Sequence, residues 1–453
     1  MIKTRTLLTL ISILVFIFIS GCDLSTLSTA NNVSPSPTAL SEIEENQEEI
    51  SEIVEEEAVE ISILGPIRGP EQENLQIVFN KFEEQYPSIK VNYTGSSGFE
   101  TMIQAQVESG EVPDIAIFPQ PGAVSALARN GKIVPLWDEV NQIVAQEFSE
   151  SWVELASVDG VPYGLFHRVN LKGLVWYDKP AFEAAGFQEP ANWGELNQLI
   201  RKMQATGIAP FCEGIESGAA TGWKGTDWIE IIMLRTQPAF VYDAWTNHEL
   251  NFSSPEVRNA FQILESFWFN EAIFRGGEEA ISLTNFRDPA SDIFGDNKDC
   301  WMHMQGNFIV GFFPEEISAD LDNQVGVFSL PTIDNSLPSA QEVGGDMWVV
   351  FEGRDSMEVR QLIEFLATPE GANPWIAQGG AIFPHQNQDV SLYPTQIDAD
   401  LAQLIIMADI VRFDASDNMD PDVNAAFWKG ISDWTSGSKT VNEVLLEIDR
   451  TLP

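Results

Sequence analysis

Apolar and polar residues between positions 59 and 129 repeat a short strand pattern followed by a longer helical pattern. Apolar runs predict strands at 59–64, 89–93 and 114–118. Apolar residues at helical spacing predict helices at 71–85, 99–108 and 123–129. Such repeats indicate a parallel sheet covered by helices on both faces, whose ligands bind beyond the carboxyl ends of the strands. We therefore expect a site at loops 65–69, 95–99 and 118–122.

The first 22 residues have the order of an export signal. Lys3 and Arg5 precede an apolar run at 7–19 that is too short to span a bilayer comfortably. Ser20-Gly21-Cys22 follows, and residues 19–22 resemble a bacterial lipobox. The resemblance implies that residues 1–21 are a lipoprotein signal peptide and that lipidated Cys22 anchors the mature chain to the membrane. An ordinary cleaved signal peptide with an incidental cysteine is the alternative.

Residues 22–58 are too polar and too acidic to form a core. Ser, Thr, Asn and Pro come first, and a run rich in glutamate follows. Like charges repel one another and keep such a segment extended. This composition predicts a disordered acidic tether between the anchor and a folded body.

Composition sets limits on that body. About 390 residues follow the tether, which is too many for one core and predicts two lobes. Asp and Glu number 68 against 24 Lys and Arg, and the formal net charge of −44 argues against nucleic acid as a partner. The histidines at 167, 248, 303 and 385 are scattered, and no CxxC pair occurs. We therefore expect no metal site and no cofactor.

The three cysteines divide into an anchor and a pair. If Cys22 carries lipid, Cys212 and Cys300 are left as an even pair in an oxidising compartment. A disulfide bond between them is the prediction, and two buried free thiols are the alternative.

Several segments resemble a known family. The run at 175–203, "PFCEGIESGAATGWKGTDW" at 210–228, "CWMHMQGNF" at 300–308, "GGDMWVVF" at 344–351 and the segment 425–449 are similar to family 1 extracellular solute-binding proteins, which include maltose-binding proteins. The branch they resemble most binds α-glucosides. The similarity covers nearly all of residues 61–452 in order.

This resemblance implies an α/β architecture, the periplasmic-binding-protein type II fold, in which a hinge joins two α/β lobes around a ligand cleft. The first lobe would contain 59–167 and 299–343, and the second 168–298 and 344–453. Arg168 and Gly344-Gly345 would form the hinge, because glycine adopts backbone conformations closed to other residues.

A sugar offers a weakly polar C–H face and a rim of hydroxyls, which suit aromatic rings and polar side chains respectively. For stacking we expect Trp223, Phe308 and Trp428, with Phe427 as a core residue. A core position is the alternative for each of the three rings. Phe99 is expected to wall the site, with the core of a helix as its alternative.

Hydroxyl contacts are expected from polar residues of the loops and crossings. Asp346 follows the two glycines, where partial desolvation demands donors from a sugar or from Lys172, and a structural ion pair across the hinge is the alternative. Solvated loop positions are the alternative for several of the others. The full set is Arg68, Gln120, Lys172, Asp227 and Asp346.

Two rival classes share the acidity and the aromatics. A glycoside-processing enzyme needs two carboxylates at a set separation, which sequence spacing cannot show, and no nucleophile elbow, P-loop, HExxH or GxGxxG occurs. A passive lectin is the second rival. The resemblance implies instead a monomeric, lipid-anchored, extracytoplasmic binding subunit of an ABC sugar importer that is not an enzyme. Its partners would be a membrane permease and a small carbohydrate such as maltose, trehalose or sucrose.

Overall fold

A computed structural model of the chain describes residues 58–408 and 410–453. The predictions for the export signal, the lipidation of Cys22 and the tether therefore lie outside the described residues. Within the described ranges, no helix is both long enough and apolar enough to cross a membrane.

The larger sheet begins with the predicted parallel strands. β1 pairs in parallel with β2 on one side and with β3 on the other, and β11 then pairs antiparallel with β3 and β6 and in parallel with β12. The strand order is β12-β11-β3-β1-β2, with β6 on β11. The strands are β1 (Val59–Gly65), β2 (Ile89–Gly95), β3 (Ile115–Phe118), β6 (Gly164–Leu171), β11 (Gln341–Val350) and β12 (Val411–Phe413).

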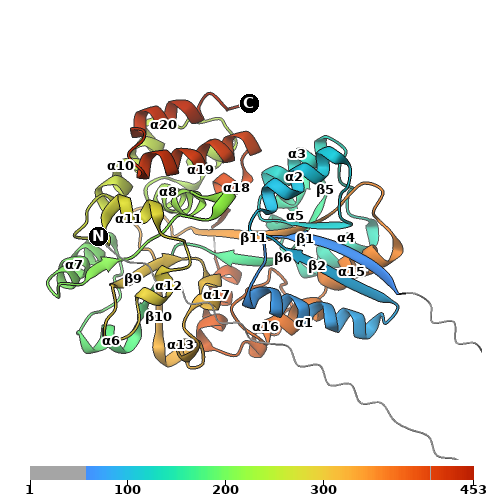
Figure 1. Cartoon of the computed structure of the whole chain (residues 1–453), viewed down its shortest axis with the longest axis horizontal. Coiled ribbons are helices and arrows are strands. Elements are labelled where there is room, and N and C mark those ends of the chain that lie inside the picture. Colours follow the sequence, from blue (N-terminus) through green and yellow to red (C-terminus); the bar gives the residue numbers. More distant parts are fainter. Residues whose placement is uncertain (1–57, 409) are drawn as a thin grey trace, which may run out of the picture. The chain divides into compact units, whose positions relative to one another are not determined.

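Helices pack on this sheet through apolar stripes. The first of them buries Leu75, Val78, Phe79 and Phe82, which share one helical face, and each buried side chain stabilises the fold by about 1.5 to 3 kcal/mol. We call the larger sheet and its helices the first lobe (Figure 1). Its other elements are α1 (Pro70–Gln85), α2 (Phe99–Ser109), α3 (Pro121–Arg129), α4 (Asp138–Glu147), α5 (Glu150–Leu155), β4 (Ser157–Val158), β5 (Val161–Pro162), α15 (Met357–Ala367) and α16 (Pro369–Ile376).

The smaller sheet has the order β10-β7-β9-β8. Its strands are β7 (Leu174–Asp178), β8 (Ala209–Phe211), β9 (Cys300–Gln305) and β10 (Val325–Ser329). The second lobe contains this sheet and the helices around it, including the C-terminal pair (Figure 1). These are α6 (Lys179–Ala184), α7 (Trp193–Gln204), η1 (Gly218–Ala220), α8 (Trp223–Thr236), α9 (Ala239–Thr246), α10 (Pro255–Trp268), α11 (Gly277–Leu283), α12 (Pro289–Asp292), η2 (Asn307–Phe312), α13 (Glu315–Ser318), α14 (Leu321–Gln324), α18 (Ala415–Asn418), α19 (Pro421–Thr435) and α20 (Val441–Ile448).

Strand pairing corrects the predicted division of the chain. Residues 299–343 were expected in the first lobe, but β9 and β10 within this range both pair with β7 in the smaller sheet. Residues 344–453 were expected in the second lobe, but β11 is a strand of the larger sheet and α15 contacts β1 and α4. The prediction was wrong at both places because strand pairing joins segments far apart in the sequence, and no local pattern identifies the partner. In the chain, η3 (Val390–Leu392) and α17 (Gln396–Ile406) follow α16 and precede β12.

The paired glycines of β11 lie close to neighbouring side chains. Neither Gly344 nor Gly345 has a positive φ, so an unusual backbone conformation is not what requires glycine there. A Cβ on Gly344 would lie 3.0 Å from Lys172 Cε, and one on Gly345 would lie 3.0 Å from Phe166 Cδ1. A larger residue at either position would therefore have to displace a neighbouring side chain.

A disulfide bond joins Cys212 and Cys300, whose Cα atoms lie 5.6 Å apart. Cys300 opens β9, and Cys212 directly follows β8, its parallel neighbour. The bond therefore closes a long loop of the second lobe at a point where two strands already run side by side.

Candidate functional site: a cavity between the lobes

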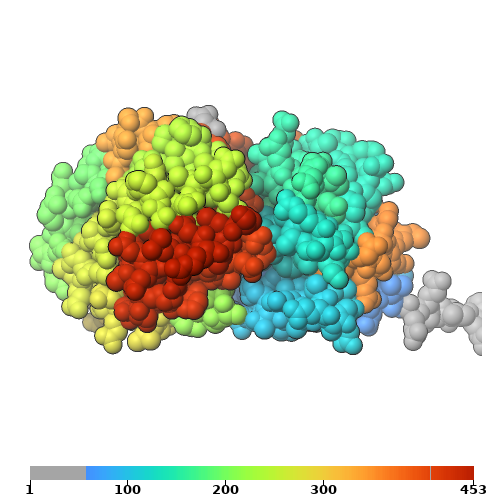
Figure 2. Space-filling model, turned by 90° about the horizontal axis from the view of Figure 1, so that it is seen from above, coloured from blue at the N-terminus to red at the C-terminus, as the bar shows by residue number. Residues whose placement is uncertain are grey.

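A cavity of about 180 Å³ lies between the two lobes, at the carboxyl ends of β1, β2 and β3. It is lined from all three of the loops in which the strand pattern predicts a site, by Arg68, Ser96 and Gln120 among others. Seen from above, the red C-terminal helices of the second lobe lie against the blue and cyan residues of the first lobe (Figure 2). Contacts between α3 and α18 and between α3 and α19 join the lobes there.

Most of the sequence-predicted binding residues line this cavity. The lining includes the three expected stacking rings and four of the expected hydroxyl partners, together with the proposed hinge residues. These residues are Trp223, Phe308, Trp428, Arg68, Gln120, Lys172, Asp346, Arg168, Gly344 and Gly345. The cavity therefore brings together side chains from both lobes that are up to 360 positions apart in the sequence (68 to 428).

Phe99 and Asp227 do not line the cavity. Phe99 is fully buried at the first position of α2, and its ring packs edge-on against Phe118 with centroids 5.1 Å apart. Asp227 is buried in α8, where its Oδ1 accepts a hydrogen bond of 2.8 Å from Lys172 Nζ. Phe99 is thus a core residue, and Asp227 supports a cavity residue from behind.

The second lobe supplies an aromatic wall. Trp223 opens α8, and its ring centroid lies 5.2 Å from that of Phe286 and 6.1 Å from that of Phe308. Gly222 caps this helix with φ 111°, and a Cβ there would lie 2.2 Å from the carbonyl oxygen of Trp428. The close approach of α8 to α19 at this glycine places both tryptophans on one side of the cavity. Phe427, next to Trp428, is fully buried as predicted.

Arg168 pairs with two carboxylates on the floor of the cavity. Its Nη2 lies 2.6 Å from Asp346 Oδ2, and its Nη1 contacts Glu71 Oε1. Burial disfavours the charged guanidinium, but Asp346 and Glu71 outweigh this cost and raise the pKa of Arg168. Burial also raises the pKa of Glu71, against the charge of Arg168. Asp346 thus accepts hydrogen bonds from Arg168 and not from Lys172. This contact is the structural ion pair that was the alternative for Asp346.

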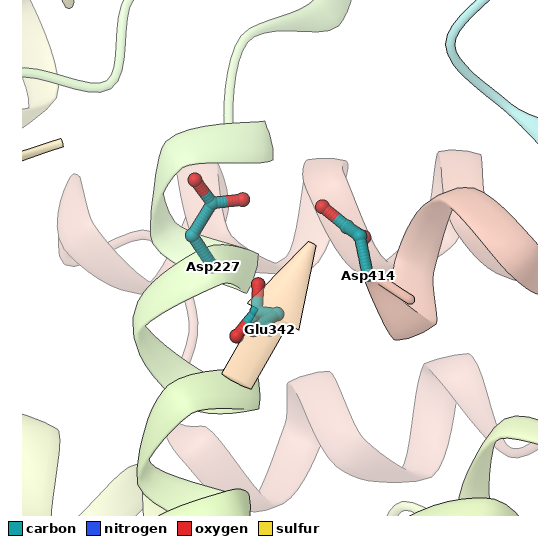
Figure 3. A group of neighbouring side chains, drawn as sticks. All are labelled: Asp227, Glu342 and Asp414. Atoms are coloured by element: carbon teal, nitrogen blue, oxygen red, sulfur yellow. The ribbon is translucent and has the colours of Figure 1, made fainter. Parts of the chain in front are cut away.

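Lys172 contacts a second group of acidic residues, which is larger than the pair around Arg168. Its Nζ donates to Asp227 Oδ1 at 2.8 Å and to Asp414 Oδ2, and it lies 5.3 Å from the centroid of the Trp223 ring. Asp227, Glu342 and Asp414 offer carboxylate oxygens within 4.8 Å of one another, from α8, β11 and the start of α18 (Figure 3). The ammonium of Lys172 supplies the positive charge between two of these carboxylates.

Burial sets the protonation of this acidic group. Burial, together with the charges of Asp227 and Asp414, raises the pKa of Glu342 well above its usual range, and both of its oxygens lack a hydrogen-bond partner among the described residues. Burial raises the pKa of Asp227 to about 6, against the charge of Lys172. For Asp414, Lys172 and local hydrogen bonds outweigh burial and lower the pKa. Burial thus favours the protonated form of Glu342, whereas Lys172 and the local hydrogen bonds favour the charged form of Asp414.

The lining also includes residues that sequence reasoning missed. Ser96 and Ser97 lie in a loop that was predicted to form the site, and Glu71 and Glu100 occupy first turns of helices that follow such loops, so the strand pattern contained a signal for them. No local pattern pointed to the other lining residues, which come from the second lobe or from the segments that connect the two lobes. They are Asn170, Ser217, Ala220, Phe286, Arg287, Phe312 and Asp417.

Comparison with known proteins gives consistent matches. Residues 68–373 match the family described as bacterial extracellular solute-binding proteins. The osmoprotective compounds-binding protein GgtB of Synechocystis sp. is 37% identical over 401 residues, which cover 88% of this chain and 94% of that protein. The α-glucosides-binding periplasmic protein AglE of Rhizobium meliloti is 33% identical over 392 residues, or 84% of each chain.

Solved structures share the fold at low identity. The bacterial solute receptor AcbH has a TM-score of 0.75 at 18% identity, and the match covers 87% of this chain and 97% of that one. Maltose-bound MalE3 of T. maritima has a TM-score of 0.68 at 19% identity, with coverage of 87% and 99%. These likenesses confirm the predicted fold class.

Proposed function

Because the chain belongs to the bacterial extracellular solute-binding protein family, we propose that it is the subunit of an ABC importer that captures a small sugar and delivers it to the membrane permease. Membership in a family of binding proteins confirms the predictions of the family and of a protein that is not an enzyme. Extracytoplasmic location follows from the same assignment.

The observation that carries the proposal is the pairing of two unlike walls in one cavity. Trp223, Phe308 and Trp428 line it with aromatic rings from the second lobe, while Arg68 and Gln120 line it with polar side chains from the first. This division matches the C–H face and hydroxyl rim of a pyranose. At about 180 Å³ the cavity is smaller than the 300 to 1,000 Å³ common for larger ligands, which favours a mono- or disaccharide.

The names of the relatives narrow the sugar class. One is described as binding α-glucosides and another as binding osmoprotective compounds. We therefore favour an α-glucoside such as maltose, trehalose or sucrose. Lining from both lobes further supports capture by lobe closure, because a ligand that contacts both lobes stabilises the closed state over the open one.

Membrane attachment through Cys22 belongs to the same proposal, together with action as a monomer. Cys22→Ser removes the thiol that the lipid modifies, so incorporation of a labelled fatty acid should disappear while the wild-type chain is labelled. Labelling that persists in the variant would contradict the lipid anchor. The binding function does not depend on this result.

Calorimetric titration of the purified protein tests the sugar-binding function. We expect one-to-one binding of at least one of maltose, trehalose and sucrose, with the sugar recovered unchanged. Trp193→Phe alters a tryptophan outside the cavity lining and should leave this binding unchanged. Hydrolysis of the sugar, or failure of these three sugars and of every other small glycoside tested to bind, would contradict the proposal.

A further inference from the structure

Two arginines of the cavity wall differ from the other cations there. Arg168 and Lys172 pair with buried carboxylates. Arg68 and Arg287 form no ion pair with any residue of 58–408 or 410–453. The Nε atom of each is buried and has no hydrogen-bond partner in the same ranges. This is unexpected in a chain with 68 acidic and 24 basic residues, where partners are plentiful.

The two guanidinium groups approach the cavity from opposite lobes. Arg68 follows β1 in the first lobe, and Arg287 lies between α11 and α12 in the second. Phe286 and Phe312 hold the guanidinium of Arg287, with its Cζ 4.7 Å and 5.0 Å from their ring centroids. Burial and then the charge of Arg68 lower the pKa of Arg287. The two like charges therefore act on each other across the space that a ligand would fill.

The unsatisfied groups of the lining are mostly donors. Buried atoms without a partner among the described residues are Arg68 Nε, Arg287 Nε, Trp428 Nε1 and Asn170 Oδ1. Three of these four atoms donate, and one accepts. A sugar hydroxyl both donates and accepts, whereas a carboxylate only accepts and forms charge-assisted hydrogen bonds with guanidinium groups. A surplus of donors therefore favours a ligand with an acceptor-only group.

The remaining polar lining suits a sugar ring. Glu100 and Asp417 offer carboxyl oxygens, and Gln120 offers an amide, all of which can accept hydrogen bonds from hydroxyls. The charge of Arg287 is also partly offset by Glu71, Asp288 and Glu216, and the charge of Arg68 acts on Glu100. One negative charge on the ligand is therefore enough to balance the two unpaired arginines.

We propose that the sugar captured by this protein carries one carboxylate on its aglycone, which Arg68 and Arg287 bind together from the two lobes. This inference rests on the proposed sugar-binding function and specifies the chemical class of its ligand. Two arginines from opposite lobes on one carboxylate also couple ligand charge to closure, since the bond to the second arginine forms only when the lobes meet.

Two matched glycosides test this assignment. Glucosylglycerol and glucosylglycerate, both α-linked, differ only in a hydroxymethyl group against a carboxylate. Calorimetry of the purified protein should show glucosylglycerate binding at least about tenfold more tightly at low salt, with the advantage falling as salt screens the charges. Arg68→Gln and Arg287→Gln should each weaken the binding of glucosylglycerate more than that of glucosylglycerol, so that the preference falls by about tenfold. Arg201→Gln, which alters an exposed arginine of α7, should change neither affinity.

The outcomes separate the two proposals. Equal binding of the two glycosides, tighter binding of glucosylglycerol, or binding of maltose, trehalose or sucrose alone would overturn the carboxylate assignment and leave sugar binding intact. Tighter binding of glucose 1-phosphate than of glucosylglycerate would overturn it too, in favour of a phosphate. If no sugar of either set binds, the proposed function fails. The salt dependence of the wild-type preference provides a test even if a variant does not fold.

Discussion

Arg168 and Lys172 stand four residues apart at the floor of the cavity, yet their surroundings differ in one respect. Arg168 faces two carboxylates, Asp346 and Glu71. Lys172 contacts Asp227 and Asp414, and the charges of Asp417 and Glu342 also act on it. One guanidinium nearly balances its neighbours, whereas one ammonium faces an excess of buried acids.

Protonation of some carboxylates reduces the excess negative charge around Lys172. A buried carboxylate without a cation costs several kcal/mol, so the acids beyond those that Lys172 can neutralise keep their protons instead. Burial is the first cause of the raised pKa of Glu230, Glu342 and Asp417. The Lys172 group thus contains several acids whose pKa is raised, whereas the Arg168 group contains one, Glu71.

The raised pKa values of these buried acids make the stability of the protein depend on pH. An acid whose pKa is raised in the folded state binds more protons there than in the unfolded chain, so stability falls as pH rises from its ordinary pKa to its folded one. With the pKa of Asp227 at about 6 and that of Glu213, buried near the disulfide, at about 7, these acids make stability fall between about pH 4 and 7. The buried His167, His303 and His385 oppose this trend below about pH 6.5, because burial lowers their pKa to about 4, 3 and 3. Asp414, whose pKa is lowered, adds the opposite slope only below its ordinary value of 3.8.

The largest effect should come from Lys172→Met. Removing the ammonium leaves Asp227 and Asp414 buried without their cation, and breaking such a pair costs about 3 to 5 kcal/mol. Urea unfolding at pH 7 measures the loss. Lys81→Met, which removes an exposed pair with Glu84, should cost under about 0.5 kcal/mol. A loss of under about 1 kcal/mol at Lys172 would show that the acids do not need it.

Arg168→Met should cost less, about 2 kcal/mol, which is typical of lost hydrogen bonds to charged groups. Asp346 and Glu71 line the cavity, so water can enter and hydrate them when the guanidinium is removed. The same unfolding experiment ranks the two variants. A larger loss for Arg168→Met than for Lys172→Met would invert the comparison and remove the role assigned to the excess acids.

Trp223→Ala separates binding from stability. Its ring lines the cavity and lies over the ammonium of Lys172, and losing it should weaken sugar binding by roughly 1 to 2 kcal/mol, or about 5- to 30-fold. Trp223→Phe keeps an aromatic face and should recover most of the affinity. Calorimetry with the sugar that binds the wild type provides the measurement. Unchanged affinity in the alanine variant would place the sugar elsewhere.

The smallest effect, and the most specific, should come from Glu342→Gln. The amide keeps the shape of the protonated acid but cannot ionise, so the variant should gain on the order of 1 kcal/mol at pH 8 and nothing at pH 4. Glu84→Gln, at an exposed position, should follow the wild-type pH curve. A loss of stability at both pH values would mean that Glu342 acts in its charged form.

The first βα repeats could be predicted from the sequence almost to the residue. The strand expected at 59–64 spans Val59–Gly65, and the helix expected at 99–108 spans Phe99–Ser109. Periodicity is a local property, so the sequence contains it in full. The lobe assignment of 299–343 failed because β9 pairs with β7 and β8, which begin about 125 and 90 residues earlier in the chain (300 − 174 = 126, 300 − 209 = 91).

Many residues of the candidate site could also be predicted from the sequence. Arg68 and Gln120 follow strands at the edge where ligands bind, the loop of small residues at 218–225 suggested Trp223, and the resemblance to solute-binding proteins suggested Trp428. Arg287 and Asp227 show the limit of such reasoning. One polar residue faces the cavity, and the other supports a neighbouring side chain. This difference depends on how α8 and the segments that connect the lobes pack, which residue spacing in the sequence does not show.

Small-angle X-ray scattering with and without sugar tests the central claim most directly. If the protein captures a sugar between two lobes, the radius of gyration should fall when the sugar identified by calorimetry is added to saturation, and the sugar should be recovered unchanged. Trp223→Ala should need a higher sugar concentration for the same decrease. Saturated binding with no change in the radius of gyration, or recovery of hydrolysed sugar, would contradict capture by lobe closure.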